Sequence, residues 1–281
     1  MREHRSAATG LGRRNRRLTD EETRERMLRT AINMINRTGL TVSLDHISFE
    51  DVIRDAGVAR STAYRHWPYK DLFFSDLVKE LSATATPTII GDEIALARRV
   101  LEKHRDWLRT PQLRTSLLLE LIRELAALDF QTVLDSPSWR TYLALHAAFS
   151  SLTDKDLRDQ VRSALAHAEA VRAATVARAW QQLATLLGYR LRPELSTSFE
   201  TLATLLSATM RGLVITALSR PEVAAHRTPA SPFGSAREAD WSLAAVGIAS
   251  LAMAFLEHDP ATEWDDNRLA EIHRVLDTWD R

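Results

Sequence analysis

Apolar positions along the chain recur every three or four residues, which is the spacing of one face of an α-helix. The sequence shows no sustained period-two alternation of the kind that marks β-strands. Thr19 and Glu22 form a capping box that predicts the start of the first helix, because each side chain can satisfy a backbone N–H that has no partner inside the helix. Gly39 predicts its end. The pattern therefore predicts an all-α fold.

Three shorter helices are expected next. Ser48 predicts an N-cap, and Gly57 predicts the end of that helix in a sharp turn. The following helix is expected from about Arg60 to Trp67, because Pro68 cannot be accommodated farther inside a helix. The last of the three, over residues 69–84, is expected to bury Leu72, Phe73, Leu77 and Leu81.

Longer helices are expected in the rest of the chain. A linker is predicted near residues 84–92, and the proline-containing stretch 219–237 is predicted to be a loop. The predicted helices span 92–108, 112–134, 137–151, 154–187, 194–219, 236–257 and 266–279.

The second and third helices, at about 48–67, have the spacing of a helix-turn-helix. Val58, Ala63 and Trp67 can supply the core contacts of the two-turn helix, which leaves its polar side chains near the surface. Such a helix fits the major groove of DNA, where arginine pairs with guanine and hydroxyl groups meet base edges or phosphate. A glycine-centred turn also joins short helices in bundles that bind no DNA, so the spacing alone leaves both interpretations open.

The sequence of this region closely resembles the DNA-binding domain of TetR-family transcriptional regulators. The resemblance covers about residues 19–82 and includes the stretch ISFEDVIRDAGVARSTAYRHWPYKDLFFSDL. The matching positions are Ile47, Ser48, Ala56, Gly57, Val58, Tyr64, His66, Trp67, Pro68 and Lys70. The resemblance implies base and groove contacts from Arg60, Ser61, Thr62 and Arg65, and phosphate contacts from Ser48, Tyr64, His66 and Lys70.

Three features depart from the family pattern. Ala59 stands at the N-cap of the recognition helix, where the family usually has Ser or Thr, so this helix is expected to lack a cap worth about 1 kcal/mol. Tyr69 stands where a small polar cap is usual. Ala63 with Trp67 replaces the commoner pairing of Leu or Phe with Phe. None of these changes removes a side chain that is expected to face DNA.

Three regions are expected along the chain. Residues 1–18 are predicted to be a disordered basic arm. The resemblance implies a three-helix helix-turn-helix DNA-binding domain at 19–84 and a larger C-terminal helical domain for ligand binding and dimerisation at 85–281. The arm contains the cluster RRNRR, and both a solvated tail and an arm that touches phosphate remain open for it.

Two C-terminal segments are candidates for a dimer interface. FETLATLLSATMRGLVITAL and WSLAAVGIASLAMAFL are apolar on more than one face and rich in small residues that permit close helix approach. They look like the paired dimer helices of the family, so a homodimer through helices at about 197–218 and 238–257 is expected, with intrachain core as the alternative. A two-fold dimer would present two recognition helices to a palindromic operator.

An unknown small-molecule effector is the other expected partner. The candidate ligand-binding residues are large rings on the helices that would surround a central cavity, namely Trp107, Trp139, Tyr142, His146 and Trp180. Plain core packing is the favoured alternative for each of these rings. No cofactor is expected, and no metal site, because the chain has no cysteine and its histidines show no HxxxH pair.

Composition and charge exclude further classes of protein. The 37 Lys and Arg residues balance 37 Asp and Glu residues, which disfavours a sequence-independent architectural DNA protein. The N-terminus lacks the apolar segment of a secretory signal, and the apolar run at 243–256 is shorter than the roughly 18 residues that span a bilayer. A cytoplasmic protein without a membrane partner is therefore expected.

Enzymatic activity is not expected. The sequence has no G-x-S-x-G, no Gly-rich phosphate loop and no cysteine nucleophile. Glu120 and Glu124 lie one helical turn apart, but Arg123 beside them favours a solvated ion-pair face over acid–base chemistry. The expected function is a sequence-specific, ligand-responsive transcriptional repressor that acts as a homodimer. A transcriptional activator or a ligand-independent regulator on the same scaffold, and remotely a helical enzyme, are the alternatives.

Overall fold

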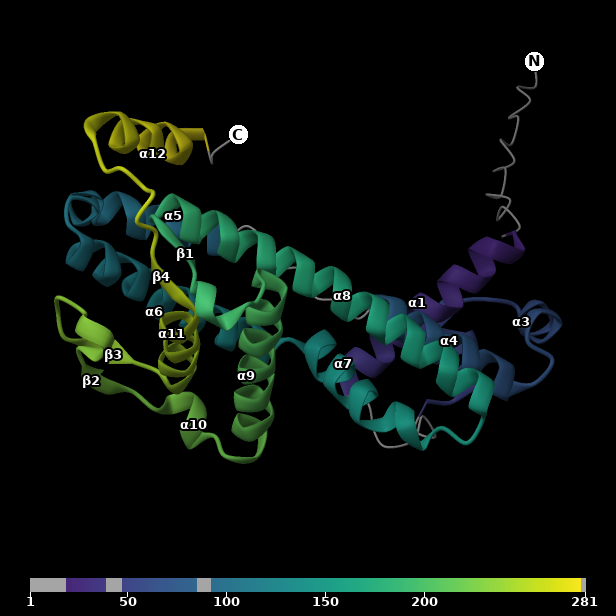
Figure 1. Ribbon diagram of the computed structural model, residues 1–281. Helices are drawn as coiled ribbons and strands as arrows, with labels where there is room; N and C mark the ends of the chain where they lie inside the picture. The colour runs from purple at the N-terminus through teal and green to yellow at the C-terminus, as the bar shows by residue number, and fades with distance from the viewer. Residues whose placement is uncertain (1–18, 39–46, 85–91, 279–281) are drawn as a thin grey trace, which may run out of the picture. The chain divides into compact units, whose positions relative to one another are not determined.

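The computed structural model describes residues 19–38, 47–84 and 92–278. The chain divides into two compact units, the first ending at Glu80 and the second beginning at Leu81. Helices dominate both units (Figure 1), which confirms the all-α prediction. The basic arm predicted at residues 1–18 and the helix end predicted at Gly39 lie outside the described residues.

The first unit contains the predicted N-terminal helices. The capping box is present: Thr19 N–H donates to Glu22 Oε2 at 2.7 Å, and Glu22 N–H donates to Thr19 Oγ1 at 3.1 Å. The helices are α1 (Asp20–Thr38), α2 (Phe49–Ala56), α3 (Arg60–His66) and α4 (Lys70–Thr84), with the unit boundary inside α4.

An aromatic cluster joins α2, α3 and α4. Phe49, Trp67 and Phe73 are buried, and the Phe73 ring centroid lies 4.8 Å from that of Phe49 and 5.1 Å from that of Trp67. Trp67 Nε1–H donates to Asp76 Oδ2 at 3.1 Å, so the large ring is buried without an unpaired donor. Ala63 is fully buried beside it. The bulk of Trp67 and the small side chain of Ala63 together fix which face of α3 points outward.

Leu72 does not face inward as predicted. Its side chain is 50% exposed, whereas Phe73, Leu77 and Leu81 are buried. Those three positions follow the four-residue spacing of a single helix face, and Leu72 lies about 100° away from that face around the helix. The prediction failed because consecutive residues of a helix cannot both sit at the centre of one apolar stripe.

The second unit is built around α6, which packs against α5, α9 and α11. Its apolar residues from Leu117 to Ile122 are buried on several sides of the helix, as expected for a central helix. The helices of this unit are α5 (Asp92–Lys103), α6 (Pro111–Asp135), α7 (Pro137–Ala148), α8 (Lys155–Leu186), α9 (Phe199–Ser219), α10 (Glu222–Ala225), α11 (Leu243–Phe255) and α12 (Asp266–Thr278).

Short strands replace parts of the predicted helices and loops. β1 (Tyr189–Leu191) pairs with β4 (Leu256–His258), and β2 (Thr228–Ala230) pairs with β3 (Ala239–Trp241), both antiparallel. The predicted helix 236–257 therefore begins only at Leu243, and the predicted helix 194–219 begins at Phe199. A strand of three residues is too short to show a period-two pattern, so these two strand pairs could not be predicted from the pattern of apolar positions.

The acidic residue Glu120 is buried, contrary to the solvated ion-pair face predicted for it. Its carboxylate accepts from Arg123 Nε at 2.9 Å and Nη2 at 3.0 Å, and also from Arg237 Nη2. Burial raises the pKa of Glu120, but the bonds and charges of Arg123 and Arg237 outweigh it and hold that pKa below its usual value. Arg237 comes from the segment between β2 and β3, so this ion pair fastens the hairpin to α6.

Candidate functional site

The turn between α2 and α3 has the geometry of a helix-turn-helix. Gly57 ends α2 in the left-handed conformation, with φ 61° and ψ 36°, which an L-residue with a side chain rarely adopts. Its N–H donates to Arg54 O at 3.1 Å, and Val58 N–H donates to Ile53 O at 3.2 Å. These bonds close the last turn of α2 and redirect the chain into α3 within three residues.

The polar residues of α3 surround its buried side. Arg60, Ser61 and Arg65 are exposed, Thr62, Tyr64 and His66 are half-buried, and Ala63 is buried. All the candidate DNA-contacting residues of this helix therefore have solvent-accessible surface in one short segment, and their contacts with DNA stay a prediction. Ala59 occupies the N-cap with extended backbone and makes no side-chain cap bond, which confirms the predicted loss of a cap.

The two candidate phosphate contacts outside α3 stand at helix starts. Ser48 is exposed and caps α2, where its Oγ accepts from Asp51 N–H at 3.4 Å. Its own O–H remains able to donate to an external acceptor. Lys70 is exposed and is the first residue of α4. Cations stabilise a helix at its other end, so an external anion is a physical reason for a lysine at this position.

In the free protein, carboxylates pair with several of the side chains that are expected to bind DNA. Glu50 Oε1 accepts from Tyr64 Oη at 2.7 Å and lies 2.9 Å from Arg60 Nη2. Arg65 Nη2 lies 2.7 Å from Asp20 Oδ1. These pairs are exposed, so each holds its arginine only weakly, and a DNA phosphate carrying the same charge can take the place of the carboxylate.

A cavity of about 940 Å³ lies in the second unit. Its wall is mostly apolar and is formed by side chains from several helices, including Ile122 and Leu125 of α6, Leu206 and Met210 of α9, and Ile248 of α11. Its volume is in the range that holds a drug-sized molecule.

Two of the five predicted ligand-binding residues line this cavity. Trp139 of α7 and Trp180 of α8 are in its wall. Tyr142 and His146 are not among the lining residues; the Tyr142 ring centroid lies 5.3 Å from that of Trp139 and 4.5 Å from that of His146. Trp107 stacks on His104 at 4.2 Å and is not among the lining residues. Ligand contact by Trp139 and Trp180 stays a prediction.

Charged residues in the cavity wall were missed from the sequence. Glu93 of α5, Asp129 of α6 and Arg172 of α8 all line it. Burial, and to a smaller extent the charge of Glu93, raises the pKa of Asp129 to about 6, although Arg172 acts in the opposite direction. The signal in the sequence was Asp129, an acidic residue within the mainly apolar stretch LAALDFQTVL. The prediction considered only large rings and therefore missed it.

The arginines of the wall already have partners. Arg172 donates from Nη1 to Ser207 Oγ at 3.1 Å and from Nη2 to Glu169 Oε2 at 2.5 Å. Arg211 donates from Nη1 to Glu169 Oε1 at 2.8 Å and from Nε to Ser207 O at 3.2 Å. Glu169 of α8 is thus linked to α9 beside the cavity through Arg211, and Arg172 of α8 makes a second link through Ser207.

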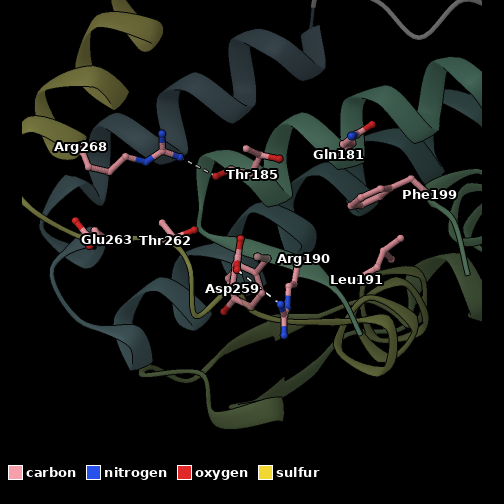
Figure 2. Close-up of a pocket in the computed structure, with 10 residues that line it drawn as sticks. Gln181, Thr185, Arg190, Leu191, Phe199, Asp259, Thr262, Glu263 and Arg268 are labelled. Atoms are coloured by element: carbon pink, nitrogen blue, oxygen red, sulfur yellow. Dashed lines mark hydrogen bonds and ion pairs between the residues drawn. The ribbon is translucent and has the colours of Figure 1, made fainter. Parts of the chain in front are cut away.

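A second, smaller pocket of about 490 Å³ lies where the C-terminal segment crosses α8 and β1 (Figure 2). Two contacts join residues of its wall: Arg268 Nη2 donates to Thr185 O at 2.8 Å, and Arg190 Nη1 lies 4.0 Å from Asp259 Oδ1. Close by, the Arg114 guanidinium stacks 3.9 Å above the ring of Trp264. These contacts anchor the segment that leads into α12.

Comparison with known proteins gives similarity only at the level of structure. No family model matches the chain, and no curated protein matches its sequence. Among solved structures, the chain is similar to NemR of E. coli in its reduced form, with 15% identity and a TM-score of 0.45 over 84% of this chain and 99% of that one. It is also similar to a TetR-family transcriptional regulator from Agrobacterium tumefaciens, with 16% identity and a TM-score of 0.40 over 72% and 90% of the two chains. SmeT in complex with triclosan matches with 17% identity and a TM-score of 0.41 over 86% and 97%.

Two further structural findings bear on the expected partners. Within residues 19–38, 47–84 and 92–278, no group of three His, Asp or Glu side chains is placed to hold a metal ion. In the same ranges one helix, α9, is long and apolar enough to cross a membrane by length and composition alone. It packs against α8, α11 and α6, as core helices of the same composition do.

Proposed function

We propose that this protein is a sequence-specific transcriptional regulator of the TetR type that binds DNA through α2 and α3. The observation that carries the proposal is the left-handed turn at Gly57 followed by a two-turn helix whose arginines and hydroxyl groups are accessible. Arg60 and Arg65 are long enough to reach guanine edges in a major groove, while Lys70 and Ser48 are suited to the phosphates on either side. The sequence resemblance over residues 19–82 supports the same assignment.

The regulator is proposed to act as a homodimer through α9 and α11. Leu205, Ile215 and Leu218 of α9 and Val246 of α11 are exposed large apolar side chains, which a partner copy would cover. Gly247 of α11 lies against α9 so closely that an added Cβ would be 3.1 Å from Thr209 Cγ2. The two helices therefore form one surface of small and apolar residues. A two-fold pairing of this surface would place two α3 helices on a palindromic site, with half-sites roughly 34 to 36 Å apart or a multiple of that.

The cavity of about 940 Å³ is proposed as the effector site. An effector that binds one conformer of the dimer more tightly than the other shifts the population, and with it the spacing of the two recognition helices. Repression relieved by the effector is the proposed outcome, in a cytoplasmic protein that has neither an enzymatic activity nor a membrane partner. A reporter gene behind the operator distinguishes repression from activation.

Binding to the DNA upstream of the protein's own coding sequence tests the proposal. The logarithm of the affinity should fall linearly with the logarithm of the salt concentration, and the double variant Tyr64→Ala/Lys70→Ala should lose most of the affinity. Arg29→Ala is the matched control for Arg60→Ala, because both arginine side chains are 70% exposed and paired with a glutamate, but Arg29 lies on α1. Equal losses from the two arginine variants, or no salt-sensitive binding, would contradict the assignment.

A further inference from the structure

The wall of the effector cavity contains two carboxylates that are not paired. Among the described residues, Glu93 Oε2 is buried with no hydrogen-bond partner, and the carboxylate of Asp129 has no hydrogen bond or ion pair. The two side chains come from neighbouring helices, α5 and α6, and both face the cavity. A buried carboxylate without a partner is costly, so the site is incomplete without a group that complements it.

The positive groups of the wall do not fill this need. Arg172 and Arg211 already share Glu169 and bond to Ser207. Arg172 is buried, and its charge does not prevent the pKa of Asp129 from rising. Arg172 and Arg211 therefore stand in the same wall as Glu93 and Asp129, but the hydrogen bonds that these two arginines donate go to Glu169 and Ser207. Arg172 Nε is itself buried without a hydrogen-bond partner.

The aromatic wall fits the same kind of ligand. Trp139 and Trp180 line the cavity, and indole faces attract cations through their negative π-surface. The Arg172 guanidinium already lies over the ring of Trp139, at 5.5 Å, which shows that this ring accepts a positive neighbour. Most of the remaining wall is apolar, so the ligand needs an apolar body to displace water from it.

We propose that the cavity binds lipophilic organic cations, with the positive group held by Glu93 and Asp129 and the apolar body against the tryptophans. The proposal that such a cation is the effector rests on the regulatory function proposed above. An anionic ligand that recruits the arginines would be the opposite arrangement, and the test below separates the two.

Two ions of nearly the same shape and opposite charge provide the test. Tetraphenylphosphonium and tetraphenylborate can each be titrated against the full chain by calorimetry, with quenching of Trp139 and Trp180 as a second readout. The cation should bind at least about ten times more tightly than the anion. Equal affinity, tighter binding of the borate, or binding of neither ion would overturn the proposal.

Isosteric variants locate the charge. Asp129→Asn and Glu93→Gln should each weaken binding of the cation by roughly tenfold and leave binding of the borate unchanged or stronger. Both variants remove a like-charge neighbour, so the fold is expected to survive, which circular dichroism checks. Asp135→Asn is the matched control, because Asp135 lies on the same helix, is exposed and is not in the cavity wall. An unchanged cation affinity in both cavity variants would contradict the assignment.

The pH dependence gives an independent readout, since neither probe ion titrates. Cation affinity should rise as pH increases through about 6, where Asp129 becomes ionised, and Asp129→Asn should remove this rise. The other charged groups that line the cavity with Asp129 are Glu93 of α5, Arg172 of α8, Arg211 of α9 and Arg268 of α12. A flat pH profile for the unmodified protein would count against a role for Asp129.

DNA binding separates failure of this proposal from failure of the proposed function. If the protein binds the cation but no DNA, the cation site is supported and the proposed regulatory function is refuted. If the protein binds DNA in a salt-sensitive way but prefers the borate, the regulatory function is supported and the cation site is refuted. Release of DNA by tetraphenylphosphonium, absent in Asp129→Asn, would support both.

Discussion

Arginine and carboxylate side chains meet on the surface of α2 and α3 and also inside the second unit, but in opposite surroundings. Arg60 of α3 and Glu50 of α2 are 70% and 45% exposed. In the second unit, Arg123 and Glu120 are 16% and 7% exposed. In water the attraction of an ion pair is small, so the exposed pair can be exchanged for a phosphate at little cost. A buried pair has no such replacement. The exposed charges are therefore available for a partner, whereas the buried charges stabilise the fold.

The largest effect is expected from breaking a buried pair. Glu120→Ala leaves Arg123 and Arg237 without their shared carboxylate and should lower the free energy of unfolding by about 4 kcal/mol. Urea denaturation followed by circular dichroism measures it. Glu25→Ala breaks the exposed pair with Arg29 on α1 and should change stability by less than about 0.5 kcal/mol. Similar losses from the two variants would remove the contrast between the regions.

The next effect concerns Asp129, the half-buried carboxylate in the cavity wall that has no partner. The pKa of Asp129 is raised from 3.8 to about 6, so its neutral form is favoured in the fold, and stability is lost as pH rises through that interval. Asp129→Asn should therefore be more stable than the unmodified protein by about 3 kcal/mol at pH 7, and the difference should vanish below pH 4. Urea denaturation at pH 4, 5, 6 and 7 checks this. A constant difference across the series would show that the substitution acts through packing instead of ionisation.

A smaller gain is expected at the start of α3. Ala59 has extended backbone at the N-cap, φ −65° and ψ 132°, and forms no cap bond. Ala59→Ser supplies an oxygen that can accept a backbone N–H of the first turn, and should stabilise the protein by about 1 kcal/mol. Thermal denaturation measures the gain. Ala59→Gly, which adds no acceptor, should give a clearly smaller gain than serine.

The smallest effect tests the exchangeable pairs themselves. Glu50→Gln frees Arg60 from its ion pair and removes a negative charge from the proposed DNA-facing surface, so operator affinity should rise about threefold. Glu25→Gln on α1 is the control and should leave affinity unchanged. Fluorescence anisotropy of a labelled operator gives both values. A weaker affinity in Glu50→Gln would mean that Glu50 positions Arg60 and Tyr64 for DNA.

Local signals in the sequence predicted the first unit well. The capping box at Thr19, the cap at Ser48 and the turn at Gly57 depend on residues within a few positions of each other, and all three are confirmed by the hydrogen bonds and backbone angles. The prediction that Leu72 is buried was wrong, because the neighbouring helices cover Phe73 and leave the adjacent Leu72 exposed.

The features of the second unit that could not be predicted depend on contacts between residues far apart in the sequence. Arg237 reaches Glu120 from 117 residues away, so no local pattern could show that this carboxylate is buried. The same holds for the cavity, where Glu93 and Asp129 face a common space only after α5 and α6 pack together. The prediction found Trp139 and Trp180 because large rings are frequent in the walls of ligand cavities. Trp107, Tyr142 and His146 were chosen on the same grounds but do not line the cavity.

The packing of Trp264 has an evolutionary consequence. Gly188 has a positive φ of 69°, and a Cβ at this position would lie only 2.8 Å from the Trp264 ring, which in turn stacks on Arg114. Descendants of this sequence that keep the C-terminal segment should therefore inherit glycine and tryptophan at these two positions together. Lineages that lose the segment are released from the steric part of this constraint, so substitutions at the two sites should covary, and in a saturation-mutagenesis library position 188 should be among the least tolerant.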